Sequence, residues 1–309
     1  MGLKSKFLLL LLVAAGLTVA CEKKSNPILD DPDSAIVALS GVCTQVDITN
    51  MPKNRAFLSI ADQNDVPVYK FSVGNFNVME DDKPVVVTGV SKVDNNADPL
   101  SVVLVLDRSG SMGGSPTDEL NIAASNFVDQ LGPADEAEII NFDTEVHVSQ
   151  GFTRDHTALK NAINNASGGG STALFDGIGT AANDLSDRNG RKFILAMTDG
   201  VENASQSYTS RNSLIDFVNS KGLAAFTVGL GFLSPESEAD LQNIASDTGG
   251  RYFTAPNITD LNTVFQKALK QFNNEVEVNF RTLSDGKRHM KVYMNYGRFT
   301  DSFEKVYGN

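Results

Sequence analysis

The sequence has no tryptophan, only two cysteines and only three histidines among its 309 residues. Two cysteines are too few for a disulfide scaffold or a cysteine-ligated zinc site. Lysine and arginine number 26 against 38 aspartate and glutamate residues, which gives a net charge of −12. Because nucleic-acid binding depends on a basic surface, this balance argues against a nucleic-acid partner. After the first 20 residues, no apolar run reaches the length that a membrane-spanning helix needs.

The remaining composition is that of a folded protein. Apolar residues make up 41% of the chain, which excludes a disordered or low-complexity protein. The length suggests about two domains. The hydrophobic pattern also changes along the chain, from alternating short runs to continuous apolar runs and back. We therefore expect two structural units of different class.

The first 20 residues are predicted to be an export signal. Lys4 and Lys6 precede an apolar stretch from Phe7 to Leu17, which is too short to span a membrane as a helix. The end of this segment, from Leu17 to Cys21, resembles the lipobox of bacterial lipoprotein signal peptides. That resemblance implies cleavage before Cys21 and acylation of this cysteine, so that lipid anchors the protein to a membrane. The alternative is an ordinary secretory signal followed by a chance cysteine.

Residues 21–35 are polar and interrupted by proline, which predicts a tether between the lipid and the folded part. An irregular arm packed on the folded part is the alternative. Glu22 follows Cys21, whereas aspartate at that place marks inner-membrane retention in enterobacterial lipoproteins. The resemblance therefore favours the outer membrane of a bacterial envelope. A lipidated Cys21 would leave Cys43 without a disulfide partner.

Residues 36–98 are predicted to form a small β-sandwich-like module of antiparallel, half-exposed strands. Apolar and polar residues alternate in short runs such as 42–48 and 66–71. The alternation returns in residues 274–309, where Asp285-Gly286 between two runs is a hairpin signal. Because a lone hairpin is barely stable in water, we expect this C-terminal hairpin to complete the 36–98 module. The domain between them would then be an insertion.

Residues 99–273 are predicted to form a doubly wound, mostly parallel α/β domain. Continuous apolar runs are typical of strands buried on both faces, in a sheet covered by helices. Ser115-Pro116 and Ser234-Pro235 are signals for helix starts. The first helix is predicted to place Ile122, Ala123, Phe127 and Leu131 on one face. The elements follow the order βαβ(β)ααβαβαβα. The apolar runs are residues 102–106, 137–140, 193–197 and 225–228.

Five polar residues follow two of these strands and a glycine-rich loop. Asp107, Ser109 and Ser111 come directly after the first strand, Asp199 comes after the strand that begins at 193, and Thr172 follows three consecutive glycines. Ligands of open α/β sheets bind beyond the carboxyl ends of the strands, so we expect these side chains to meet at one edge. Three hydroxyls and two carboxylates are hard oxygen ligands, suited to Mg²⁺, Ca²⁺ or Mn²⁺ and poor for zinc or copper.

This set, Asp107, Ser109, Ser111, Thr172 and Asp199, resembles the metal-ion-dependent adhesion site of von Willebrand factor type A domains. The resemblance covers about residues 100–273. It implies that the hydroxyls contact a divalent cation, that the aspartates often act through water, and that Asp or Glu of a protein partner completes the coordination shell. The sequence departs from the family pattern by an extra glycine and serine before the threonine. A capped strand-to-helix turn without metal is the alternative.

We therefore expect a lipid-anchored bacterial envelope protein that binds a protein partner through a divalent cation. We expect no enzymatic activity, because no general base or nucleophile motif accompanies the five residues. Two alternatives stay open: a metal-assisted hydrolase that uses the same cation, and a structural envelope scaffold that binds no metal. The presence of all five ligand positions argues against the scaffold.

Overall fold

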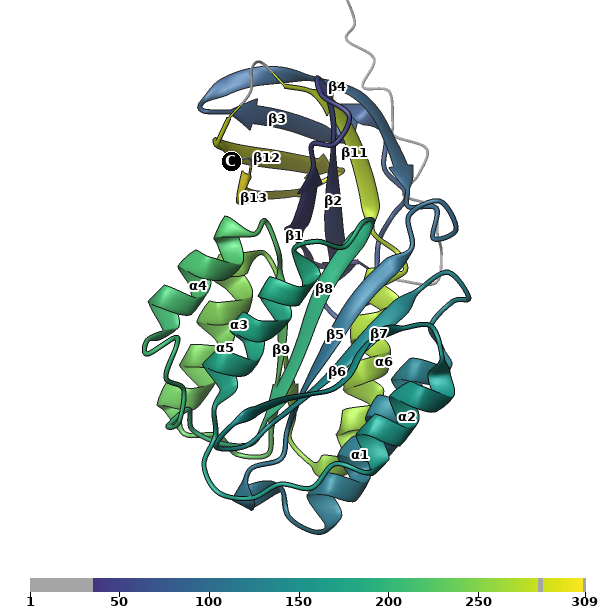
Figure 1. Ribbon diagram of the computed structural model, residues 1–309. Coiled ribbons are helices and arrows are strands. Elements are labelled where there is room, and N and C mark those ends of the chain that lie inside the picture. The colour runs from purple at the N-terminus through teal and green to yellow at the C-terminus, as the bar shows by residue number, and fades with distance from the viewer. Residues whose placement is uncertain (1–35, 283–285, 308–309) are drawn as a thin grey trace, which may run out of the picture.

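The computed structural model describes residues 36–282 and 286–307. Within these ranges the chain forms an antiparallel β module and a three-layer α/β unit, placed end to end (Figure 1). None of the helices described there is long and apolar enough to cross a membrane. The predicted signal peptide, Cys21 and the predicted tether lie outside the described residues.

The α/β unit is built on a six-stranded sheet with the order β10-β9-β8-β5-β6-β7. Neighbouring strands are parallel except β6 and β7, so the predicted doubly wound sheet is confirmed, with an antiparallel edge strand. Winding reverses at β5, and ligands bind at the carboxyl end of such a switch point. The strands are β5 (Leu100–Asp107), β6 (Glu136–Phe142), β7 (Val146–Thr153), β8 (Arg191–Thr198), β9 (Ala225–Leu230) and β10 (Tyr252–Ala255).

Helices cover both faces of this sheet, with α1, α2 and α6 on one face and α3, α4 and α5 on the other (Figure 1). Ala123, Phe127 and Leu131 of the predicted face are buried, whereas Ile122 is 51% exposed, so the prediction is wrong at that residue alone. The helices are α1 (Ser115–Asp129), α2 (His156–Asn164), α3 (Leu174–Leu185), α4 (Arg211–Ser220), α5 (Pro235–Thr248) and α6 (Leu261–Phe272), with short 3₁₀ turns η1 (Val73–Asn75), η2 (Gly110–Met112) and η3 (Ile258–Asp260).

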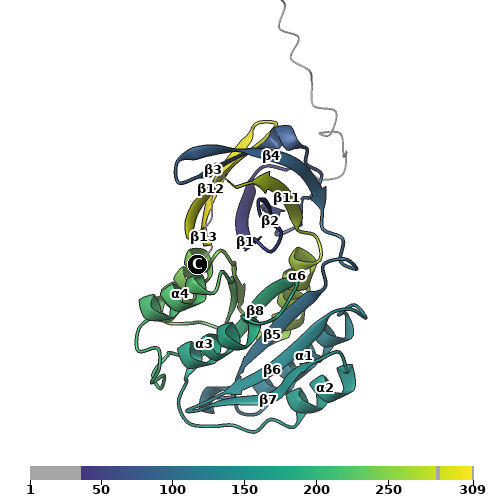
Figure 2. The ribbon, with the colours of Figure 1, turned by 45° about the horizontal axis from the view of Figure 1, so that its top comes forward.

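The β module is one antiparallel sheet with the order β1-β2-β11-β4-β3-β12-β13. Four of these strands precede the α/β unit and three follow it. The sheet curls around its own apolar core, which brings β1 near β13 (Figure 2). There the Gly41 N–H donates to Asp301 Oδ2 at 2.9 Å. The strands are β1 (Leu39–Asp47), β2 (Lys53–Asp62), β3 (Phe76–Glu80), β4 (Lys83–Lys92), β11 (Val276–Arg281), β12 (Arg288–Tyr296) and β13 (Phe299–Tyr307).

The hairpin predicted at Asp285-Gly286 is wrong. The flanking strands β11 and β12 do not pair: β11 lies between β2 and β4, and β12 lies between β3 and β13. Between its two partners, β11 buries Val278 and Phe280 completely, which a two-stranded hairpin does not allow. The hairpin of this segment is β12–β13, where Gly297 takes a φ of 58° in a two-residue loop that favours glycine. Asp285 itself lies outside the described residues.

Two further details of the module differ from the prediction. Strand β2 is buried on both faces rather than half exposed: Ile60 faces the module's core, and the neighbouring Ser59 hydroxyl donates to Gln271 Oε1 of α6 at 3.0 Å. Residues 66–71 form no strand, and Pro67 makes only an isolated bridge to β2. Val66 and Val68 make the two hydrogen bonds of this bridge, and Pro67 between them has no N–H with which to extend the pairing to another strand.

A buried arginine joins the two units where the chain crosses between them. Arg191, the first residue of β8, is fully buried, and its guanidinium donates to the carbonyls of Asp98 and Phe272. It also pairs with the buried carboxylate of Glu275 at 3.2 Å. These partners lie just before β5 and around the end of α6. One side chain therefore binds both segments that connect the β module to the α/β unit. Because the parallel strands begin at this junction, their carboxyl ends lie at the opposite edge of the sheet.

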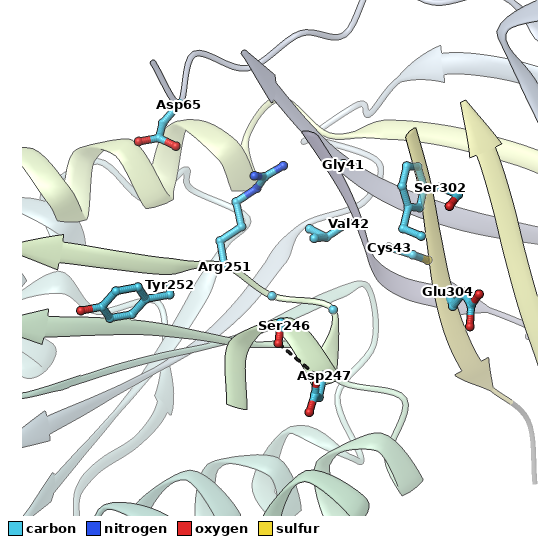
Figure 3. A pocket seen from close by; sticks show the side chains of 13 residues that line it. Gly41, Val42, Cys43, Asp65, Ser246, Asp247, Arg251, Tyr252, Ser302 and Glu304 are labelled. Carbon is cyan, nitrogen blue, oxygen red and sulfur yellow. Dashed lines mark hydrogen bonds between the residues drawn. The ribbon is translucent and has the colours of Figure 1, made fainter. Parts of the chain in front are cut away.

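A second buried cation crosses the same junction. Lys305 of β13 donates to the carbonyls of Leu223 and Thr248 in the α/β unit, each at 2.7 Å. Burial lowers the pKa of Lys305 to about 8 and raises the pKa of the free Cys43 thiol to about 12. A cavity of about 680 Å³ opens beside this contact, with Cys43 on one side and Arg251 on the other (Figure 3). It lies apart from the predicted metal-binding residues.

Candidate metal centre

Hydrogen bonds join four of the five predicted residues at the carboxyl edge of the α/β sheet. The Ser109 N–H donates to Asp107 Oδ1 at 2.7 Å. The hydroxyl oxygens of Ser109 and Ser111 lie 3.2 Å apart, and the Ser111 hydroxyl donates to Asp199 Oδ1 at 2.6 Å. The structure therefore brings the ends of β5 and β8 together through these side chains.

Thr172 lies beside this group on a third segment. Its N–H donates to Asn203 Oδ1 at 2.9 Å, and its carbonyl accepts the N–H groups of Asn203 and Ala204. A Cβ placed on Gly200 would lie 3.1 Å from Thr172 Oγ1, which shows how closely the hydroxyl approaches the residue after Asp199. All five predicted residues therefore gather around one edge of the sheet.

The glycine-rich loop before Thr172 packs as only glycine allows. A Cβ on Gly168 would lie 2.2 Å from the carbonyl oxygen of Arg108. Gly170 has a φ of 84°, and a Cβ there would lie 2.5 Å from Thr144 Oγ1. The carbonyl of Gly170 also accepts the N–H of Gly110 at 3.1 Å. The loop's extra length relative to the family pattern therefore leaves it in contact with the serine turn.

The site has two carboxylates and no cationic side chain to balance them. Asp107 is fully buried, and burial and the nearby Asp199 raise its pKa, although the Thr198 hydroxyl donates to Asp107 Oδ2 at 2.5 Å. Arg108 follows directly, but its guanidinium bonds two asparagine side chains and a backbone carbonyl instead. Within the described part of the chain, neither aspartate takes part in an ion pair.

This donor set fits a hard divalent cation. Three hydroxyl oxygens and two carboxylates offer only oxygen, and the two negative charges balance one divalent ion. Asp107 and Thr172 are buried, whereas Ser111 is exposed and Asp199 is partly exposed, so a cation held here would face solvent on one side. The described residues contain no group of three or more His, Cys, Asp or Glu side chains placed so that they could hold a metal ion. The candidate centre therefore depends on its hydroxyls.

Three residues that were not predicted from the sequence hold the loops of this site. Asn203 binds both backbone polar groups of Thr172. Glu202 accepts the N–H groups at the start of α3 and in its own loop, and Asp176 accepts the N–H groups of residues 206–208. An acidic residue near a helix start could have indicated such a role. The N–H groups that these carboxylates bind across the loops, however, lie about 30 positions away in the chain.

The α/β unit matches a family of known proteins. A family model described as von Willebrand factor type A domain matches residues 101–267. An uncharacterized protein of Synechocystis is 29% identical over 182 residues, which are 57% of this chain and 42% of that protein. The chain thus matches less than half the length of that relative.

Several solved structures share the fold, including the following two. A von Willebrand factor type A protein from Catenulispora acidiphila superposes with a TM-score of 0.50 at 10% identity, over 88% of this chain and 73% of that chain. Proximal thread matrix protein 1 from the mussel byssus superposes with a TM-score of 0.52 at 19% identity, over 62% of this chain and 49% of that chain. The metal-ion-dependent adhesion site of the mussel protein is occupied by zinc.

At these identities the structural likeness shows the fold alone. The family model is stronger evidence of family membership, because its match runs from β5 into α6 and includes all five residues of the candidate metal centre. The matched segment is also more than half of the 309 residues. The chain therefore belongs to the von Willebrand factor type A domain family.

Proposed function

We propose that this protein binds a protein partner through a divalent cation held by Asp107, Ser109, Ser111, Thr172 and Asp199. The observation that carries the proposal is the chain of hydroxyls between two carboxylates that no basic side chain neutralises. The cation supplies a positive, electrophilic point at the edge of the sheet. The residues of this chain hold it and leave one side open, where Asp or Glu of the partner completes its shell.

The charge balance supports an acidic partner group. Two aspartates cancel the charge of a divalent cation but do not exceed it. At metal–oxygen distance a third carboxylate is nearer to the cation than to either aspartate, so its net interaction is attractive. The net charge of −12 opposes an acidic partner only weakly, because repulsion between exposed charges is screened within about 8 Å in physiological salt. The local attraction therefore outweighs the distant repulsion.

The hydrogen bonds of the neighbouring acidic side chains favour a binding function over hydrolysis. Glu202 and Asp176, the further carboxylates of these loops, each accept several backbone N–H groups. These hydrogen bonds occupy the carboxylate oxygens that a general base would need to take a proton. A metal-free scaffold is disfavoured because Asp107 would then stay buried with no cation beside it.

The test is a calorimetric metal titration of the mature, soluble chain carrying Cys21→Ser. Mg²⁺, Ca²⁺ and Mn²⁺ are compared, and Zn²⁺ is added because the mussel protein holds zinc at its site. Asp107→Ala should weaken binding by about 100-fold or more, equivalent to about 3 kcal/mol, because the ion's charge is then half balanced. Asp216→Ala, which removes an exposed acid of α4, is the matched control. Equal affinity in the two variants would contradict a metal centre at Asp107.

We further propose that lipid on Cys21 anchors the protein in the bacterial envelope, on the outer membrane. The lipobox resemblance supports this, and Cys21 lies outside the described residues. Cys21→Ser should release the full-length protein from the membrane fraction or stall its processing, whereas Cys43→Ser should not. A Cys21→Ser variant that is processed normally and still fractionates with membranes would overturn the anchor.

A further inference from the structure

One aromatic side chain at the edge that carries the candidate metal centre is almost completely exposed. Phe232, in the loop between β9 and α5, is 99% exposed. Phenylalanine is among the residues most often buried in folded proteins. Phe232 lies on the loop next to the candidate metal centre, because β9 is the direct neighbour of β8, which ends just before Asp199.

The backbone around Phe232 is held on both sides. Gly231 takes a φ of 71°, and its N–H donates to the carbonyl of Ala255 at 2.9 Å. Leu233 packs against the core of the α/β unit, and Ser234 caps the start of α5. Turning Phe232 inward would break these contacts. The structure therefore presents the phenyl ring to solvent in a defined place.

A second apolar side chain is presented in the same way on the adjacent loop. Val201 follows Asp199-Gly200 and is 50% exposed. The Gly200 N–H donates to the Thr198 hydroxyl at 3.0 Å, and Glu202 is tied to the start of α3, so the backbone on both sides of Val201 is also held. The two loops leave neighbouring strands at the same level of the sheet, because Thr198 pairs with Gly229.

We propose that Phe232 and Val201 form the apolar part of the partner-binding surface, beside the metal. The partner is a protein segment with a large aliphatic or aromatic side chain two to four residues from the Asp or Glu that reaches the cation. Candidate ligands lie at the carboxyl ends of β5 and β8 and Phe232 follows β9, so the acidic and apolar side chains of the partner are up to two strand spacings of about 4.8 Å apart. That distance is about three residues of an extended chain that advances about 3.3 Å per residue. The inference rests on the metal-bridged binding proposed above.

The position and charge of this surface favour a protein over a membrane. The described chain begins at Ile36 in the β module, near Arg298, whereas Phe232 lies at the opposite end of the α/β unit. An anchor that precedes Ile36 therefore attaches at the far end of the molecule. The first turn of α5 next to Phe232 carries Glu236 and Glu238, which repel anionic lipid headgroups.

The test uses a displayed library of linear peptides with one fixed central aspartate, selected on the soluble chain in Mn²⁺. We expect enrichment of Leu, Ile or Phe two to four positions from the aspartate. Fluorescence anisotropy of an enriched peptide is then compared across variants. Phe232→Ser should weaken it by roughly 10- to 100-fold, the affinity equivalent of burying a phenyl ring, and Val201→Ser by less. Val86→Ser, at a 66% exposed residue of the β module, is the control.

The outcomes separate this inference from the proposed function. If the selected peptides need the aspartate and the metal but show no apolar preference, or bind Phe232→Ser as well as wild type, the inference is overturned and metal-bridged binding stands. If no peptide is enriched, or binding persists in EDTA, the proposed function fails and the inference with it. Self-association, or flotation with phosphatidylcholine–phosphatidylglycerol vesicles, that depends on Phe232 would also overturn it.

Discussion

Buried charged side chains have different partners at the two edges of the α/β sheet. At the amino edge, Arg191 and Glu275 are both fully buried and paired within the chain at 3.2 Å. At the carboxyl edge, Asp107 is equally buried, but its partners are hydroxyl and backbone donors rather than a cationic side chain. At the first edge the buried Glu275 carboxylate has a cation of its own chain beside it, whereas at the second we propose that the cation comes from solvent.

The difference follows from what covers each edge. The β module closes the amino edge, so charges there are cut off from water and need partners of their own chain. The carboxyl edge carries exposed Ser111 and partly exposed Asp199, so ions can reach it from solvent. The comparison teaches that one fold can place a structural ion pair at one end of its strands and the buried carboxylate of a candidate metal centre at the other end. The following changes test that contrast.

The largest effect is expected at the closed edge. Arg191→Ala leaves the buried Glu275 carboxylate and two backbone carbonyls without their cation and should lower the free energy of unfolding by about 3–5 kcal/mol. Arg211→Ala breaks a partly exposed ion pair with Asp240 and should cost less than about 1 kcal/mol. Urea unfolding of both variants measures the difference. If the two cost the same, the junction is not held by its buried pair.

A buried carboxyl group near the closed edge provides a further test, because it forms no ion pair among the described residues although the charge of Arg188 acts on it. Glu138 of β6 has a buried Oε1 without a hydrogen-bond partner in the described residues, and burial together with Asp184 raises its pKa to about 8. The folded state therefore keeps a proton that the unfolded state releases above its ordinary pKa of 4.5. Stability should fall as pH rises from about 4.5 to 8.

The slope of this loss should reach at most about 1.4 kcal/mol per pH unit, which is the value for one proton. Glu138→Gln carries no proton to lose, so urea unfolding between pH 5 and 8 should be flatter for this variant than for wild type. Asp216→Ala, at an exposed acid, should keep the wild-type slope. Equal slopes for Glu138→Gln and wild type would show that this carboxyl is ionised in the folded protein at neutral pH.

The smallest effect is expected from a neutral ligand at the open edge. Thr172→Ala removes one hydroxyl and no charge, so metal affinity should fall about tenfold, or about 1.4 kcal/mol, far less than for Asp107→Ala. Partner binding should fall more than metal binding. Thr157→Ala, at an exposed position of α2, is the matched control in the same calorimetric titration. A loss as large as that of Asp107→Ala would show that charge balance does not dominate the site.

Much of the fold could be predicted because its signals are local. Continuous apolar runs and serine–proline starts marked the strands and helices of the α/β unit in their observed order. The candidate site followed from strand polarity, since parallel strands end at one edge and Asp107 and Asp199 each follow a strand. The hairpin at Asp285-Gly286 failed because turn chemistry carries no information about which distant strand offers a better partner.

The sequence by itself determined the doubly wound sheet and the residues that gather at its carboxyl edge, because periodicity and strand order act over short stretches of chain. Only the tertiary structure decided that β11 enters between β2 and β4 and that Arg191 meets Glu275 from 84 positions away. It also decided that Phe232 faces solvent, although its residue type favours the interior. Packing between segments far apart in the chain sets these three features, and no local pattern records it.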